Sequence, residues 1–160
     1  MNDCNRILPG EGIAGAILGM SQEEVRAMLG NPSEMSTETF DDGTDWVNLD
    51  YEKLGLSFGF SSDEGYVLDL IRVEREDMEL FGQKIGGLSF DETVAVFEAN
   101  GEAPDGLPIE QADDEGQHIL TCDFEGVSVW FLNDALCMLQ ITPRWRDDDT
   151  QIFPHRAEKS

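Results

Sequence analysis

Residues 19–25 read Gly-Met-Ser-Gln-Glu-Glu-Val, and the pattern returns at residues 87–93 as Gly-Leu-Ser-Phe-Asp-Glu-Thr. The separation between the two stretches is 68 residues. Two further stretches recur in the same order: 55–60 (Gly-Leu-Ser-Phe-Gly-Phe) as 126–131 (Gly-Val-Ser-Val-Trp-Phe), and 67–73 as 135–141. Similarity within one chain at a nearly fixed separation indicates that a supersecondary unit has been copied.

Each copy opens with a sequence that is typical of a capped helix. Ser21 is followed three residues later by Glu24, and Ser89 by Glu92, which matches the capping box. Apolar residues with helical spacing follow both serines: Val25, Met28 and Leu29, then Val94, Val96 and Phe97. We expect the first helix to end at Gly30 and the second near Asn100. Upstream of the caps, Ile13–Leu18 and Leu80–Ile85 could form another short helix or an apolar brace.

Strand patterns follow each helix. Apolar residues alternate with polar ones in 46–51, 56–60, 119–124 and 127–132, which predicts antiparallel strands with one face on a core. The predicted fold class is α+β, with two tandem repeats that each pack a capped helix, or a helix pair, on a three- to four-stranded antiparallel sheet. The predicted boundaries are 12–75 for repeat 1, 80–142 for repeat 2 and 143–160 for a C-terminal tail.

The chain carries 34 acidic and 10 basic residues, a formal net charge of −24. Such a surface repels phosphate, so ordinary nucleic-acid binding is excluded. It suits a basic protein partner, whose approach long-range attraction would accelerate. The alternative is that the acidity serves solubility alone.

Three cysteines, Cys4, Cys122 and Cys137, form no disulfide framework and predict free thiols in a reducing compartment. Strand alternation places Cys122 and Cys137 toward the core. We find neither a membrane-spanning apolar stretch nor a secretory signal, and we expect a cytoplasmic protein that does not bind membranes.

The face of each predicted sheet that carries no helix is the first candidate site. It would present Trp46, Asn48, Asp50, Tyr66 and Arg72 from the first copy. From the second copy it would present Thr121, Asp123, Trp130, Leu132, Met138 and Gln140. Tryptophan among polar neighbours is typical of a protein-binding surface. Alternatively, these aromatic side chains pack between the repeats or under the tail.

Two acidic loops are the second candidate site. Asp41, Asp42 and Asp45 precede a strand in the first copy, and Asp113, Asp114 and Glu115 hold the equivalent place in the second. They could occupy a basic cleft of a partner, or they could be solvated hairpin tips, where Asp is favoured by turn chemistry. A calcium site at Asp41, Asp42 and Asp45 is a weaker alternative, because the spacing does not match an EF-hand. The chain shows no P-loop, Rossmann fingerprint, metal-binding His pair or nucleophile elbow, so we expect neither a catalytic site nor a cofactor.

The motif around the first helix carries a family resemblance. Gly19, Met20, Ser21, Glu24, Val25, Leu29, Gly30 and Pro32, followed by a short sheet, resemble the unit of the SmpA/OmlA outer-membrane assembly lipoproteins. The second copy keeps Gly87, Leu88, Ser89 and Glu92. Two such units in tandem are similar to the β-lactamase inhibitor proteins. That resemblance implies a free sheet surface that grips a target enzyme.

Together these features favour a non-catalytic, acidic protein-binding module. We expect a bacterial immunity or inhibitor protein that neutralises a basic toxin enzyme, as a monomer. The alternative is a structural or assembly factor that acts through self-association or scaffold binding. A small-molecule site would require a deep pocket between the repeats.

Overall fold

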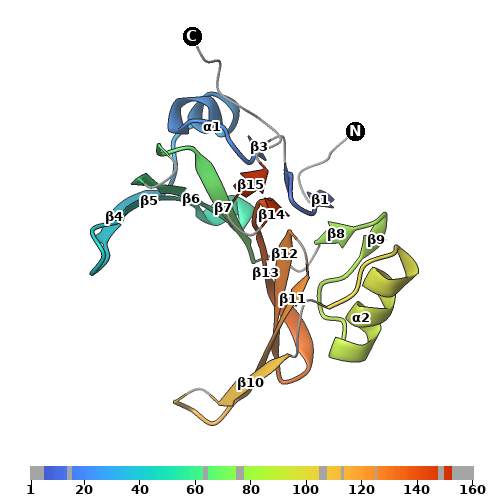
Figure 1. Ribbon diagram of the computed structural model, residues 1–160. Helices are drawn as coiled ribbons and strands as arrows, with labels where there is room; N and C mark the ends of the chain where they lie inside the picture. The colour runs from blue at the N-terminus through green and yellow to red at the C-terminus, as the bar shows by residue number, and fades with distance from the viewer. Residues whose placement is uncertain are drawn as a thin grey trace.

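The computed structural model describes residues 6–13, 16–62, 65–74, 78–104, 108–112, 114–124, 126–147 and 150–152. Strands dominate these residues, and eight of them form one antiparallel sheet (Figure 1). In spatial order this sheet contains β10 (Ile109–Ala112), β11 (His118–Phe124), β12 (Val127–Leu132), β13 (Ala135–Ile141), β7 (Leu68–Val73), β6 (Leu56–Ser61), β5 (Asp45–Tyr51) and β4 (Glu34–Thr39).

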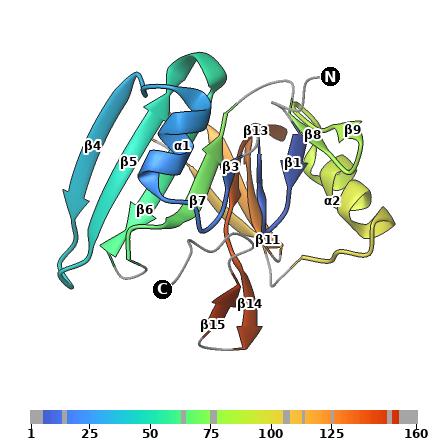
Figure 2. The ribbon, with the colours of Figure 1, turned by 90° about the horizontal axis from the view of Figure 1, so that it is seen from above.

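A second, smaller sheet has five strands. Its order is β3 (Ala16–Ile17), β2 (Gly12–Ile13), β1 (Arg6–Leu8), β8 (Glu79–Leu80) and β9 (Gln83–Lys84). The helices are α1 (Gln22–Leu29), α2 (Phe90–Ala99) and the short 3-10 helix η1 (Glu52–Leu54). After β13, the chain forms a hairpin of β14 (Arg144–Asp147) and β15 (Thr150–Ile152), which projects from the body of the molecule (Figure 2).

The middle of the eight-stranded sheet is a seam between two strands that lie far apart in the sequence. β7 and β13 pair there in antiparallel register, with Val73 opposite Leu139, Arg72 opposite Gln140 and Ile71 opposite Ile141. Outward from the seam, the strand order is β7-β6-β5-β4 on one side and β13-β12-β11-β10 on the other. We call these two halves of the sheet the first arm and the second arm.

The helix starts are those that the sequence predicts. The amide of Glu24 donates to Ser21 Oγ over 3.1 Å, and the amide of Ser21 donates to Glu24 Oε1 over 2.9 Å. Ser89 and Glu92 form the same pair of bonds, at 3.2 Å and 2.9 Å. Both capping boxes are therefore complete, and the prediction of a helix after each serine is confirmed.

Substitution of either cap serine should destabilise the protein measurably. We expect Ser21→Ala and Ser89→Ala each to lower the free energy of unfolding by about 0.5–2 kcal/mol, because an amide at the helix start loses its acceptor. Urea unfolding followed by circular dichroism measures the effect. Gln22→Ala, one residue further on in α1, is the control, and an equal loss in that variant would contradict the capping explanation.

One hydrophobic core lies on a single side of the eight-stranded sheet. α1 buries Val25 there, and the Tyr51 hydroxyl of β5 donates to the carbonyl of Gly30 over 2.7 Å. α2 packs on the second arm, where the ring of Phe97 stacks on that of Phe124 with centroids 3.7 Å apart. The five-stranded sheet lies on the same side between the helices (Figures 1 and 2), and buried residues of all these elements form one cluster.

The predicted fold class is wrong. The structure is mostly β, with two α-helices and two large sheets of eight and five strands, and not a pair of capped-helix-on-sheet units. The strands of both halves form one sheet because the backbone N–H and C=O groups along the edges of β7 and β13 pair with each other at the seam. The segments expected as a short helix or brace are instead the β2–β3 and β8–β9 hairpins. Strands of two residues are too short to show a period in the sequence.

Candidate functional site: the uncovered face of the eight-stranded sheet

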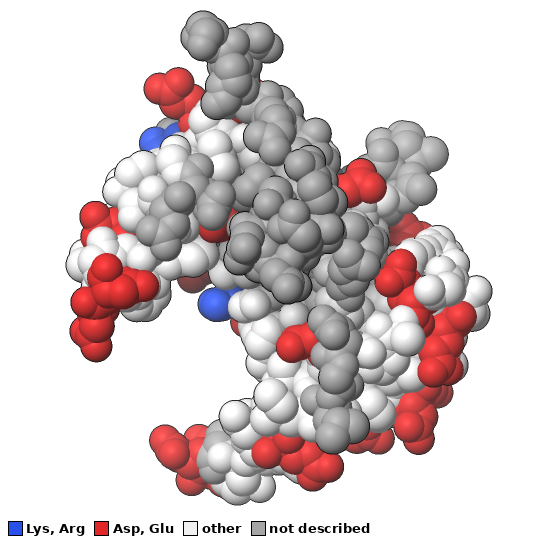
Figure 3. Space-filling view, in the orientation of Figure 1, with Lys and Arg blue, Asp and Glu red and all other residues white. Residues whose placement is uncertain are grey.

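The eight-stranded sheet is curved, and its two arms enclose a hollow on the side away from the helices (Figure 1). The space-filling view shows this hollow open to solvent, with acidic side chains on the ends of both arms (Figure 3). We call this side the concave face. Alternation along the strands decides which side chains it carries: in β12, for example, Val129 and Phe131 are buried in the core, whereas Ser128 and Trp130 on the other face are half-buried.

A row of polar residues crosses the concave face from β4 to β11. The strand registers place one residue of each of seven strands in line, since residues directly opposite in antiparallel strands point to the same face. The row reads Glu34, Asp50, Ser57, Arg72, Gln140, Ser128 and Asp123. The hydroxyl of Ser57 donates to Asp50 Oδ1 over 2.7 Å. Asp50, Arg72 and Asp123, three residues singled out from the sequence, thus lie in one line.

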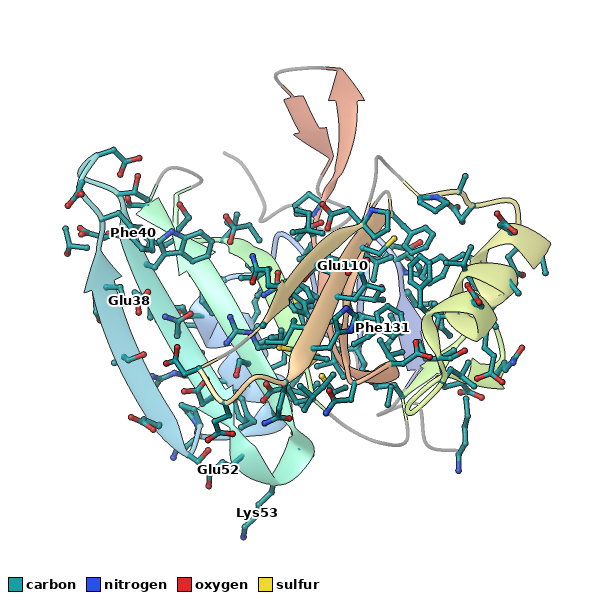
Figure 4. The ribbon with its side chains drawn as sticks, turned by 90° about the horizontal axis from the view of Figure 1, so that it is seen from below. Glu38, Phe40, Glu52, Lys53, Glu110 and Phe131 are labelled. Atoms are coloured by element: carbon teal, nitrogen blue, oxygen red, sulfur yellow. The ribbon has the colours of Figure 1, made fainter. Side chains whose placement is uncertain are left out.

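The first arm is hollowed into a groove of about 470 Å³ on this face. Trp46, Asn48, Asp50 and Arg72 line it together with Glu38 of β4 and Phe40, which directly follows β4. The rings of Phe40 and Trp46 meet edge to face with centroids 6.4 Å apart and an interplanar angle of 76°. Figure 4 shows Glu38 and Phe40 on this arm.

A missing side chain at Gly59 makes room for the Trp46 indole. A Cβ atom built at Gly59 would lie 2.9 Å from Trp46 Cζ3, closer than such atoms approach in proteins. In the second arm the corresponding position of the repeated stretch holds Trp130 itself. Trp46 and Trp130 therefore both face the hollow, one from each arm.

The second arm presents a more apolar surface. Trp130 lies directly opposite Thr121 and Met138, and Leu132 lies opposite Ile119. Ile109 of the outermost strand, opposite Thr121, is 56% exposed. In the antiparallel register of β13 and β7, Met138 lies on the Glu74 side of the polar row, away from Leu70. Trp130 lies opposite Met138, whereas Trp46 lies on the Leu70 side of the row. The two tryptophans are therefore on opposite sides of the polar row.

The acidic loops form the tips of the two arms. Asp41 and Asp42 lie in the β4–β5 turn and Asp45 begins β5, whereas Asp114 and Glu115 lie in the turn before β11. Asp113 lies outside the described residues. Asp42 Oδ1 accepts from the Thr44 amide over 3.0 Å, and Asp45 Oδ1 accepts from the Thr39 hydroxyl over 2.8 Å. Asp42 and Asp45 therefore stabilise their own hairpin, and Glu115 Oε1 likewise accepts from Gln117 Nε2 over 3.0 Å. Asp41, Asp42, Asp114 and Glu115 are all exposed to solvent.

Hydrogen bonds from the backbone and side chain of Thr44 hold the pKa of Asp42 below its ordinary value of 3.8. We expect Thr44→Val, which keeps the amide and removes the hydroxyl, to raise the Asp42 pKa part of the way back. Carbon-detected NMR titration of the carboxyl group measures it. At pH values above the pKa of Asp42 in the unfolded chain, these hydrogen bonds stabilise the folded turn. That stabilisation is lost as the pH falls through the pKa of Asp42 in the folded protein. An Asp42 pKa unchanged by the substitution would contradict the assigned cause.

Two sequence-based placements differ from the structure. Tyr66 is not on the concave sheet face: it lies in the loop between β6 and β7 with a left-handed backbone (φ 62°). Cys137 does not point into the core but is exposed. A β-bulge between Trp130 and Phe131 shifts the register of β13 at this point, so strict alternation fails for one residue.

Sequence reasoning missed the outermost strands, β4 and β10, and with them Glu34, Glu38, Phe40 and Ile109. Every residue of β4 and β10 is exposed, so the strands carry no alternating pattern. Phe40 and Ile109 are large apolar side chains left 47% and 56% exposed. Phe40, an apolar residue directly before the acidic Asp41-Asp42 turn, was the signal available in the sequence, and Ile109 had no comparable signal.

The described residues give little support to a metal site, a membrane-spanning helix or a nucleophilic cysteine. Within them, no three His, Cys, Asp or Glu side chains are grouped so that they could hold a metal ion, and this includes Asp41, Asp42 and Asp45. No described helix is both long and apolar enough to cross a bilayer. Burial raises the pKa of the Cys122 and Cys137 thiols. The negative charge of Asp123 raises the pKa of Cys122 further, and that of Glu74 raises the pKa of Cys137. Both thiols stay protonated at neutral pH, which is unfavourable for a nucleophile. Cys4 lies outside the described residues.

The chain was compared with protein-family models, curated proteins and solved structures, and none of them matches.

Proposed function

We propose that this chain is a non-catalytic protein-binding module that holds a basic protein on its concave face. The observation that carries the proposal is a continuous sheet surface that none of the described elements covers, with Trp46 and Trp130 on either side of a polar row. Half-buried tryptophans among polar neighbours supply large contact area at a small entropic cost. Acidic residues at both arm tips surround this surface with negative potential (Figure 3).

The proposed partner is a toxin enzyme, and the chain acts as its immunity or inhibitor protein in the cytoplasm. A net charge of −24 steers a basic protein toward the hollow and keeps nucleic acid away. A concave surface fits a convex element of the partner and can cover the entrance to an active site. Free thiols at Cys122 and Cys137 are in keeping with a reducing compartment.

Site-specific photo-cross-linking tests the proposal. A benzophenone amino acid replaces Asp123 or Ser36 on the concave face, or Ala95 on the exposed side of α2 as the control. We expect cross-links in host cells from the two concave positions and none from Ala95. The captured protein, identified by mass spectrometry and purified, should be basic, bind one to one and lose enzymatic activity when bound.

Cross-linking from Ala95 with equal yield would overturn the proposal. So would a captured protein that retains full activity in the complex. A cross-linked second copy of this chain would instead favour the assembly-factor alternative, in which two concave faces associate.

A further inference from the structure

We propose that the groove of the first arm is a recognition site for a cationic side chain, a lysine or arginine presented by the protein partner. This inference rests on the proposed function and deepens it, because it divides the concave face into a part that recognises charge and a part that recognises apolar surface.

The groove has the size and shape of a ligand site. Its volume of about 470 Å³ lies within the range of about 300–1,000 Å³ that is usual for ligand pockets. A second hollow of about 410 Å³ continues it along the sheet, and the two share Asp50, Ser57 and Arg72. An extended chain segment could therefore lie along the arm with consecutive side chains in both hollows.

The aromatic end of the groove suits a cation. Glu38 lies directly opposite Trp46 in the strand register, so a carboxylate stands next to the indole on the same face. Phe40 contacts the same indole edge to face. A lysine or arginine can place its methylene stem along these rings, with its charge near the carboxylate and within reach of the aromatic faces.

The charge lining the two hollows gives the sign of the occupant. Carboxylates outnumber guanidinium groups five to one there: Glu34, Glu38, Asp50, Glu52 and Glu74 against Arg72. Figure 4 shows Lys53, beside Glu52, pointing away from the arm. An anionic or purely apolar occupant would leave this negative charge uncompensated, whereas a cationic segment neutralises it.

The surface of the second arm supports the division of the concave face into a part that recognises charge and a part that recognises apolar surface. Its concave surface is built around Trp130, Leu132 and Met138, with Ile109 at the rim, and Asp123 is the acid of its polar row. An apolar side chain of the partner fits this arm better than a charged one. The two arms therefore recognise different chemistry.

A designed peptide tests the groove without the natural partner. The probe is an acetylated and amidated 9-residue peptide of alternating lysine and serine, and the same peptide with glutamate for lysine is the control ligand. The signals of the tryptophan indole N–H groups of the full chain, assigned with tryptophan-to-phenylalanine variants, report where the peptide binds. We expect the lysine peptide to shift the Trp46 signal more than the Trp130 signal, and the glutamate peptide to shift neither.

Substitutions with opposite expected signs sharpen the test. Glu38→Gln should weaken lysine-peptide binding about two- to five-fold at low salt, since an exposed charge pair contributes this much. Arg72→Gln should strengthen binding by a similar factor, because it removes a like charge from the groove. Glu98→Gln, an identical change of charge on α2, is the matched control and should leave binding unchanged.

Equal shifts at Trp46 and Trp130, or an effect of Glu98→Gln as large as that of Glu38→Gln, would show that attraction is nonspecific and would overturn the inference. The absence of any shift at Trp46 would also overturn it. If the peptide fails while concave-face cross-links still capture a basic enzyme, the proposed function stands without the cation site. If the peptide binds as expected and no such enzyme is captured, the proposed function fails and the cation site remains.

Discussion

Phe97→Ala should lower the free energy of unfolding by about 3–5 kcal/mol. Phe97 is fully buried on α2, its ring stacks on Phe124 of β11 at 3.7 Å with an interplanar angle of 6°, and the ring of Phe81 meets it edge to face at 5.7 Å. Truncation leaves a cavity where helix, eight-stranded sheet and the β8–β9 hairpin meet. The loss is a large fraction of the about 5–15 kcal/mol that stabilises a typical domain, so the variant should unfold at a clearly lower denaturant concentration.

Denaturant unfolding followed by circular dichroism and by tryptophan fluorescence measures this loss. Phe97→Leu keeps most of the apolar volume and should lose clearly less. Glu98→Ala, the next residue on the exposed side of α2, should stay within about 0.5 kcal/mol of the parent protein. A loss below about 1 kcal/mol in Phe97→Ala would mean that α2 is not packed on the sheet as described.

Trp130→Ala should weaken binding of the captured partner by about 2–4 kcal/mol, which raises the Kd about 30- to 800-fold. Trp130 is half-buried near the middle of the second arm, and its truncation removes the largest contact surface there. Isothermal titration calorimetry with the purified partner measures the change. The effect should appear at high and low salt alike, because the interaction that is lost is apolar.

Met28→Ala is the control, because Met28 is a large apolar side chain on α1 that is 44% exposed but lies away from the concave face. It should leave the Kd unchanged. Far-UV circular dichroism of Trp130→Ala shows whether the sheet is intact, and Trp130→Phe should recover part of the affinity. If Met28→Ala weakened binding as much as Trp130→Ala, the partner would not bind the concave face.

The elements that sequence predicted well are those whose signals are local. Ser21 and Ser89 mark the helix starts because a capping box involves residues only three positions apart. The Asn133-Asp134 turn joins β12 to β13, with both residues at positive φ (50° and 65°). Alternation also identified β5, β6, β11 and β12, since each of them buries one face.

What sequence missed depends on contacts between distant segments. The seam places Gln140 opposite Arg72, and nothing near either residue indicates that their strands pair. The parallel pairing of β1 with β8 likewise joins residue 7 to residue 80 through strands of two or three residues. The bulge beside Trp130 exposes Cys137, and it is a property of the pairing of β12 with β13, not of either strand alone.

The first candidate site was therefore predicted in part. Trp46, Asn48 and Asp50 share one face because they alternate along β5, and Arg72 joins them because it alternates with buried Ile71 and Val73 in β7. Glu38 lies on a strand that buries nothing and Phe40 directly follows that strand, so neither residue belongs to a buried pattern.

The eight-stranded sheet ends at β4 and β10, whose outer rims face no further strand of that sheet. Open rims of this kind template the addition of other chains and the growth of fibres. Glutamates at 34 and 38 on one rim and at 110 on the other would place like charges together whenever two molecules met rim to rim. Like charge on the two rims therefore opposes the addition of one molecule to another along these edges.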